Sequence, residues 1–253
     1  GISMGIKGTD VARDSSDIVL ADDNFASIVN AMEEGRIVFL NTRQASAFLI
    51  TTNIAEIIII LLMLIVKLPL PFLPLQILWL NLVTGSGSDV SLATERHKDH
   101  ILRQKPRNFK ENLLPRSIYP FLAMLIGVMV ATTIFIFTFY LPQGIDKART
   151  AAFTLLCLTE LFNVYNMRSL DKSAFKIGIF GNKWVNIAAI VSLILIFGVL
   201  YITFFQNIFQ FTSLSLTEFL FITVISSLVL LFGEAYKFFK KRNLLPKFTL
   251  STW

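Results

Sequence analysis

The sequence has little charge, one cysteine and two histidines. Asp, Glu, Lys and Arg make up 16% of the 253 residues, against roughly a quarter in an ordinary soluble domain, while hydrophobic residues make up 54%. The single Cys157 excludes an internal disulfide and a thiolate metal cage. His97 and His100 have i, i+3 spacing, but a solvated loop explains them better than a zinc site because no further His or Cys is available. The composition indicates a polytopic membrane protein.

The start of the chain lacks two familiar signals. Residues 1–8, GISMGIKG, are rich in glycine but have no Lys-Ser/Thr pair, so they do not form a phosphate-binding P-loop. The basic-then-apolar pattern of a secretory signal is also missing. Because the sequence has no initiator Met, we expect that it begins inside a longer protein.

Long apolar runs are what the sequence has instead. Six segments approach or exceed the roughly 20 residues that a membrane-spanning helix needs. They are 47–66, 72–93, 117–140, 150–168, 184–208 and 216–236. The sequence therefore predicts an all-α polytopic membrane protein with six transmembrane helices.

Basic residues alternate along the loops between these segments. Lys and Arg are concentrated after the second, fourth and sixth segments and are sparse after the first, third and fifth. Cytoplasmic loops carry the excess of Lys and Arg, so we expect both termini of this multi-pass protein to be cytoplasmic. The net charge of +6 is then explained by the loops, and no nucleic-acid partner is expected.

The first 46 residues follow a different pattern. GISMGI (1–6) predicts a short buried strand, Thr9 predicts a helix cap, and IVLA (18–21) predicts a second strand. Helical spacing then runs into the first apolar segment, with Gly35 as the expected break. Because this stretch is too short to bury a core alone, we expect the tail of an α/β domain joined to the membrane by a stalk helix.

Asp22 and Asp23 follow the second predicted strand. Two adjacent carboxylates could suggest catalysis, but capping of the next helix is the simpler interpretation. We therefore expect no catalytic residue here.

Polar side chains occupy the centres of three apolar segments. The pairs are Asn53 with Glu56, Asn81 with Thr84, and Glu160 with Asn163. Each pair has i, i+3 spacing and so shares one helix face. An ionisable residue at the bilayer centre costs at least ~2.5–3.5 kcal/mol, which makes a functional site the leading hypothesis. The alternative is that these groups join helices through interhelical hydrogen bonds.

The stretch TGSGSD (84–89) weakens the second apolar segment as a helix. Glycine costs ~1 kcal/mol relative to alanine in a helix interior. A discontinuous helix at the midplane frees backbone carbonyls that can coordinate a cation. Carbonyls, carboxylates, amides and hydroxyls are hard ligands that suit Ca²⁺, Mg²⁺, Na⁺, K⁺ or protons. Close helix packing is the alternative explanation of the glycines.

Several stretches resemble one family. MGIKGTDVARDSSDIVLADDNFASIVNAMEEGR (4–36) resembles the end of the phosphorylation domain of P-type cation-transporting ATPases. NIAE (53–56), LPLPFLPLQILWLNLVT (68–84) and RQKPR (103–107) are similar to its fifth and sixth transmembrane helices and the following loop. ARTAAFTLLCLTELFNVYN (148–166) resembles its eighth helix. The resemblance covers the whole chain and is closest to the calcium and sodium/potassium pump branch.

The resemblance implies an organisation and a set of ligands. The six spans would be helices five to ten of ten. The cation-binding positions would be Asn53, Glu56, Asn81, Thr84 and Glu160, with Asp89 and Asn163 as further candidates. The domains would be 1–35, the tail of the phosphorylation domain; 36–46, a stalk helix; 47–242, the transmembrane domain; and 243–253, a cytoplasmic tail. The partners would be the lipid bilayer, the transported cation, and the rest of the pump, namely its actuator, nucleotide and phosphorylation domains and helices one to four.

The sequence departs from the family at the second span. Gly85 stands where the family has a ligand aspartate, and Ser88 stands where it has a proline. Asp89 lies one turn further on the same face, but a regular helix puts it about 6 Å along the axis from Gly85. We therefore expect Asp89 to lie too far toward the cytoplasm to replace that aspartate directly.

The family's ATP-handling motifs are the second departure. DKTG, TGES and GDGxND do not occur, so no cofactor is expected on this chain, and Mg²⁺ and ATP would belong to the full-length pump. The leading expectation is the C-terminal transport domain of an ATP-driven cation pump. A free-standing six-helix channel or accessory subunit, and a degenerate pump that the Gly85 change has inactivated, stay open as alternatives.

Overall fold

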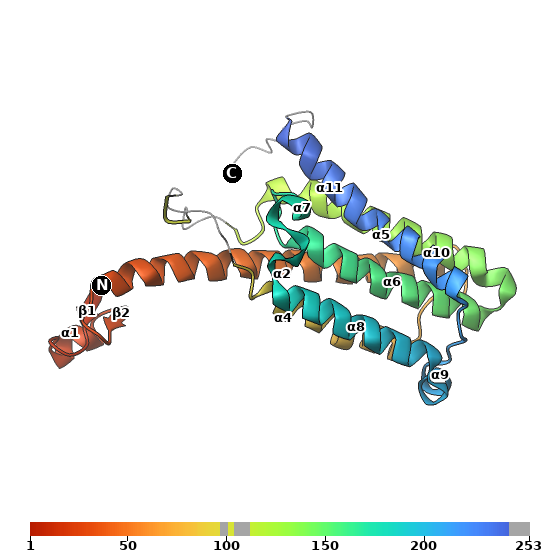
Figure 1. Cartoon of the computed structure of the whole chain (residues 1–253), viewed down its shortest axis with the longest axis horizontal. Helices are drawn as coiled ribbons and strands as arrows, with labels where there is room; N and C mark the ends of the chain where they lie inside the picture. Colours follow the sequence, from red (N-terminus) through yellow and green to blue (C-terminus); the bar gives the residue numbers. More distant parts are fainter. Residues whose placement is uncertain (97–100, 104–111, 243–253) are drawn as a thin grey trace.

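A long helix joins a small N-terminal remnant to a helical bundle (Figure 1). The computed structural model describes residues 1–96, 101–103 and 112–242. The His97/His100 pair and most of RQKPR lie outside the described residues.

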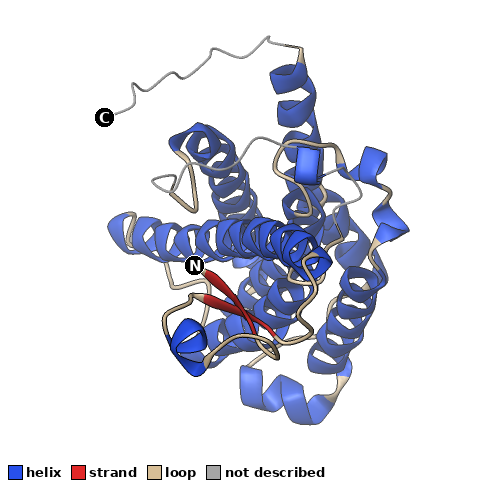
Figure 2. Cartoon of the chain, turned by 90° about the vertical axis from the view of Figure 1, so that its left-hand side faces the viewer, coloured by secondary structure: helices blue, strands red, loops and turns tan. Residues whose placement is uncertain are grey.

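The N-terminal remnant is a two-stranded parallel sheet with one short helix. Strand β1 (Ile2–Met4) pairs with β2 (Ile18–Leu20), and α1 (Asp10–Asp14) connects them (Figure 2). The Thr9 hydroxyl accepts a hydrogen bond from the Ala12 amide, which confirms the predicted cap. The expectation that β1 is buried is wrong, since Ile2 is 49% exposed. Two strands and a five-residue helix are too small to cover their own apolar side chains.

The two aspartates after β2 have different partners. Asp22 accepts hydrogen bonds from the Asn24 amide and the Ser27 hydroxyl, near the start of the next helix, but it caps no amide of that helix, so the predicted capping role is wrong. Asp23 instead accepts from the amides of Ile6 and Lys7, at 2.9 and 2.7 Å, so its predicted capping role is wrong. These backbone bonds, the Ile6 bond foremost, lower the pKa of the Asp23 carboxyl. Asp23 therefore ties the loop after β1 to the turn after β2.

Helix α2 (Ala26–Ile65) runs without interruption for 40 residues. The expected break at Gly35 is absent from it. One glycine costs ~1 kcal/mol, and a helix that continues on both sides avoids the cost of a second nucleation. The remnant and the bundle are therefore connected by a single rod (Figure 1).

The bundle is built around α6 (Ile145–Met167), which packs against most of the longer helices of the bundle. Most of its side chains are buried. The neighbouring elements, in chain order, are α3 (Pro74–Trp79), the π-helix η1 (Leu80–Gly85), α4 (Ser86–Leu92), the 3-10 turns η2 (Ile101–Arg103) and η3 (Arg116–Ile118), α5 (Tyr119–Tyr140), the 3-10 turn η4 (Leu141–Gln143), α7 (Ala174–Ile177), the 3-10 turn η5 (Ile179–Gly181), α8 (Lys183–Tyr201), α9 (Thr203–Phe209), α10 (Leu216–Ser226) and α11 (Leu228–Lys241).

Four stretches of the described chain are long and apolar enough to cross a membrane. They are Ala26–Ile65, Arg116–Gln143, Lys183–Tyr201 and Leu216–Lys241. The two other expected spans are helical but different in kind, because a π-helix interrupts 74–92 and α6 carries many polar side chains. A helical membrane protein is therefore supported, and the count of six spans stays a prediction.

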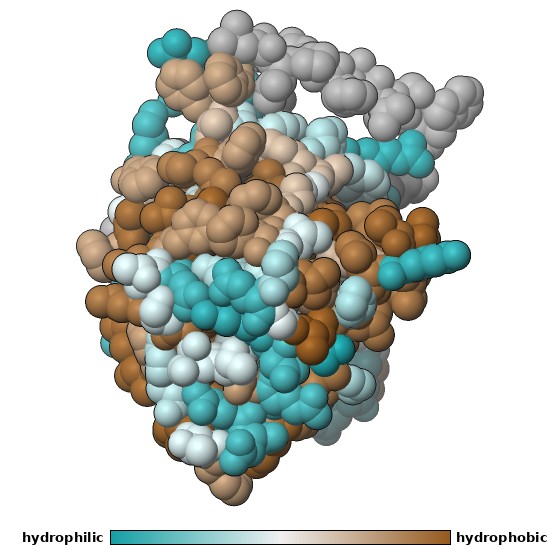
Figure 3. Space-filling model, turned by 90° about the vertical axis from the view of Figure 1, so that its right-hand side faces the viewer, coloured by the Kyte–Doolittle hydropathy of each residue, from teal (hydrophilic) through white to brown (hydrophobic). Residues whose placement is uncertain are grey.

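Two predicted spans have different ends. The fifth stops at Tyr201 rather than at residue 208, because Ile202 is extended with ψ of 117° and a separate helix, α9, follows it. The last continues to Lys241, with a break at Ser227 between α10 and α11. The end of the bundle away from the remnant shows a polar patch flanked by apolar side chains (Figure 3). Apolar residues such as Ile57, Phe135 and Ile194 are exposed along the helices, as lipid-facing side chains would be.

Candidate cation site

Glu56 of α2 and Asn81 of η1 meet across the helix interface. The Asn81 amide donates to Glu56 Oε2 at 2.9 Å and to the Ile77 carbonyl at 3.1 Å. Glu56 is only 4% exposed, and its Oε1 has no hydrogen-bond partner within the described structure. Half of this buried carboxylate is therefore left for another ligand.

Helix α6 contributes a second set of unpartnered atoms. Within the described residues, Glu160 Oε2, the Thr159 hydroxyl and both amide atoms of Asn163 are buried without a hydrogen-bond partner. Each such group costs ~1–3 kcal/mol, and buried polar groups are nearly always paired. A ligand, a proton or water is needed to satisfy them.

Three carboxylates of this region come from three different helices. Glu56 belongs to α2, Asp89 to α4 and Glu160 to α6. Asp89 is half-buried, with Oδ1 buried and unpartnered within the described structure. As the side chains stand, no three acidic, His or Cys side chains of the described part are close enough to hold a metal ion. A cation here would need amide and hydroxyl oxygens as well, or a rearrangement of the carboxylates.

The remaining predicted ligands divide into two cases. Thr84 is fully buried, and its hydroxyl lies 3.7 Å from the Cys157 sulfur of α6, so it belongs to the same interface. Asn53 is half-buried and donates to the Leu49 carbonyl of its own helix. The hydrogen bond of Asn53 therefore does not join it to the other predicted ligands.

The π-helix replaces the break that TGSGSD predicts. It ends at Gly85, and a methyl group added to that residue would lie 3.4 Å from the Leu80 carbonyl oxygen. The Ser86 hydroxyl donates to the Asn81 carbonyl, and the Ser88 hydroxyl donates to the Thr84 carbonyl, both at 3.1 Å. The expectation of freed carbonyls is wrong at these two positions, because the serines supply donors. Single π turns inside helices are frequent at functional sites.

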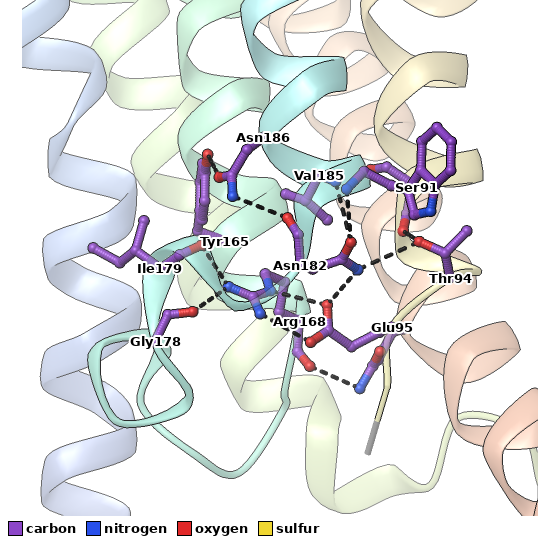
Figure 4. A network of polar contacts seen from close by, with 12 residues as sticks. Ser91, Thr94, Glu95, Tyr165, Arg168, Gly178, Ile179, Asn182, Val185 and Asn186 are labelled. Carbon is purple, nitrogen blue, oxygen red and sulfur yellow. Dashed lines mark hydrogen bonds and ion pairs between the residues drawn. The ribbon is translucent and has the colours of Figure 1, made fainter. Parts of the chain in front are cut away.

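Sequence reasoning missed a buried ion pair, which Figure 4 shows from close by. Arg168, 1% exposed, donates from Nε and Nη2 to the two oxygens of Glu95, each at 2.9 Å. Asn182 donates to the same carboxylate at 2.9 Å, while Arg168 Nη1 donates to the carbonyls of Gly178 and Ile179. The signal that could have found the pair is the opposite charge of Glu95 and Arg168 at the ends of two predicted spans.

Two amides of α2 attach the long helix to this ion pair. Gln44 donates to the Arg168 carbonyl at 3.0 Å. Asn41 donates to the carbonyls of Ala93 and Glu95, at 2.9 and 3.0 Å. The point where α2 enters the bundle is therefore fixed to the ends of α4 and α6.

Comparison with known families identifies this arrangement. Residues 69–239 match the family described as "Cation transporting ATPase, C-terminus".

The chain belongs to the cation-transporting P-type ATPases.

Named members of the family cover most of the chain. Calcium-transporting ATPase 1 of Bacillus cereus is 35% identical over 95% of the chain, and the calcium-transporting ATPase of Bacillus subtilis is 37% identical over 83%. Human calcium-transporting ATPase type 2C member 2 is 32% identical over 98%. The chain spans 24% to 29% of the length of these three relatives and corresponds to the C-terminal part of a P-type ATPase. The resemblance in the sequence is thereby confirmed.

Proposed function

We propose that this chain is the transport domain of an ATP-driven pump for a small cation. The observation that carries the proposal is the set of unpartnered buried oxygens on Glu56 and Glu160, on helices that pack together. Two acidic side chains with open ligand positions inside a membrane bundle suit a transported cation better than helix adhesion, which would pair both oxygens.

The proposed ligands come from three helical segments. Glu56 and Glu160 supply charge. Asn81 donates to Glu56, the Thr84 hydroxyl lies against Cys157 of α6, and Asn163 follows Glu160 by three residues on the same helix. Asn53 is a further proposed ligand. To bind the cation, its side chain would have to give up the hydrogen bond to the Leu49 carbonyl. Asp89 is a further candidate carboxylate, half-buried and with Oδ1 unpartnered within the described residues.

The charge of this cluster favours a divalent cation. Hard oxygen ligands with several carboxylates suit Ca²⁺, whose affinity is tuned by ligand charge count. The relatives named as calcium-transporting ATPases support the same ion.

Energy would reach the site through α2. In the proposed division, residues 1–35 end the phosphorylation domain, 36–46 form the stalk, 47–242 span the membrane six times, and 243–253 form a cytoplasmic tail. Both termini are cytoplasmic in this proposal. ATP and Mg²⁺ would act on the actuator, nucleotide and phosphorylation domains that accompany helices one to four. A continuous helix from the remnant to Glu56 can transmit the resulting displacement because its hydrogen bonds are internal.

Cation binding to the full-length pump tests the proposal. Glu56→Gln and Glu160→Gln keep side-chain shape but remove charge, so each should weaken ⁴⁵Ca²⁺ binding and Ca²⁺-dependent phosphorylation about tenfold or more. Glu34→Gln, on the exposed outer part of α2, is the matched control and should change neither.

Unchanged Ca²⁺ binding in both site variants would assign Glu56 to helix adhesion through Asn81. Cation flux across bilayers that contain the chain alone would favour the channel alternative. If the unsubstituted pump binds no Ca²⁺, the result would favour the alternative of a degenerate pump that the Gly85 change has inactivated.

A further inference from the structure

A cavity of about 520 Å³ lies where the end of α4 meets the start of α8. Thr94 and Arg96 line it from one side, and Gly181, Lys183 and Trp184 line it from the other. It shares Asn182 with the ion-pair network of Figure 4. This cavity plays no part in the proposed cation site.

The described lining of the cavity is positively charged. Arg96 and Lys183 are both exposed, and none of the described residues that line the cavity is acidic. Glu95, the adjacent carboxylate, is already neutralised by Arg168. The Lys183 ammonium also lies 5.3 Å from the centre of the Trp184 ring. Two cations, with no acidic side chain among the described residues around them, suit an anion.

An apolar strip continues from the cavity along α8. Trp184, Ile187, Val191 and Ile194 recur at helical spacing and are 47% to 63% exposed. Val90 of the adjoining α4 is 68% exposed, and the two helices approach closely at Gly87, where an added methyl group would lie 3.8 Å from the Ser192 hydroxyl. The cationic cavity and the apolar strip together match an amphiphile.

We propose that this cavity binds the phosphate headgroup of an anionic phospholipid, whose acyl chains lie along α4 and α8. A free phosphate would satisfy Arg96 and Lys183 equally but would leave the apolar strip unused. Basic residues next to a membrane surface attract anionic lipids at ~1 kcal/mol per charge, and Trp favours the same interfacial depth. The proposal does not rest on the pump function.

Native mass spectrometry of the full chain in a neutral detergent tests it, with phosphatidylglycerol, phosphatidylcholine and inorganic phosphate as the three probes. We expect retained phosphatidylglycerol, weaker binding of phosphatidylcholine, and no displacement of the lipid by millimolar phosphate. Arg96→Gln and Lys183→Gln should each weaken phosphatidylglycerol binding about fivefold, and the double variant about 25-fold.

Lys241→Gln is the matched control, because this lysine at the end of α11 is exposed but does not line the cavity. Lys183→Arg keeps the charge and should retain binding. Equal binding of phosphatidylcholine, displacement by phosphate, or an unchanged affinity in the double variant would each overturn the proposal.

Discussion

At the scale of single residues, this chain differs from the family pattern in the place of one carboxylate. The family has an aspartate where this chain has Gly85, and this chain has Asp89 one helical turn later. Asp89 is half-buried, and its Oδ1 has no hydrogen-bond partner within the described structure. The sequence expectation is that Asp89 lies too far along the axis to replace that aspartate directly, while staying a further candidate ligand. Residues 86–92 form the regular helix α4, so Asp89 lies about 6 Å along the axis from Gly85, as the spacing predicts.

Substitutions at these two positions separate their roles. Gly85→Asp should raise Ca²⁺ affinity or stoichiometry in the full-length pump, because it adds a charge beside Thr84. Asp89→Asn should weaken Ca²⁺ binding, but less than Glu56→Gln, since Asp89 is the more exposed of the two carboxylates. Equilibrium ⁴⁵Ca²⁺ binding measures both. If Asp89→Asn abolishes binding while Gly85→Asp changes nothing, the main ligand has moved to Asp89.

The buried ion pair gives a stability prediction with an internal control. Arg168→Met should lower the free energy of unfolding by about 3–5 kcal/mol, because it leaves the Glu95 carboxylate buried without its partner. Lys240→Met removes one member of an ion pair with the exposed Asp171 and should cost less than about 1 kcal/mol. Thermal unfolding in detergent compares them. Equal losses would mean that the Arg168 pair contributes no more than a surface contact.

At the scale of elements, Gly35 offers a direct test of the rod formed by α2. An added methyl group at this position meets nothing within 4 Å, so Gly35→Ala should stabilise the helix by about 0.5–1 kcal/mol. Gly35→Pro should cost about 3 kcal/mol and interrupt the helix. Amide hydrogen exchange over residues 26–45 measures the change. Faster exchange in the alanine variant would contradict a continuous helix.

The sequence predicted individual helices and strands better than the contacts between them. The Thr9 cap and both strands follow from short-range patterns, and the cost of placing Glu56 and Glu160 in an apolar segment is visible in the sequence alone. The bond between Asn81 and Glu56 and the network around Arg168 depend on how each helix is rotated about its axis. That rotation is set by packing of the whole bundle, which no local pattern contains.

At the scale of the whole molecule, the orientation of the bundle can be tested by labelling. Cysteine placed at Lys176 should react from the cytoplasmic side and cysteine placed at Gln143 from the opposite side, because α6, about 35 Å long, separates the loops that hold them. Cys157 is fully buried and adds little background. Permeabilised membranes provide the control. Reaction of both positions from one side would refute the orientation. A cysteine at Lys105 should also react from the cytoplasmic side, but that residue lies outside the described residues.

The attachment of α2 through Asn41 and Gln44 gives the long helix the geometry of a lever with its fulcrum at the bundle entrance. The outer arm, from Ala26 to Asn41, is about 23 Å long, and the inner arm, from Gln44 to Glu56, is about 18 Å. If the helix pivots rigidly there, a sideways displacement of the outer end moves Glu56 in the opposite direction by about four-fifths as much. Because the two displacements are nearly equal, Glu56 can move away from Asn81 only if the N-terminal end of α2 moves sideways by a similar distance.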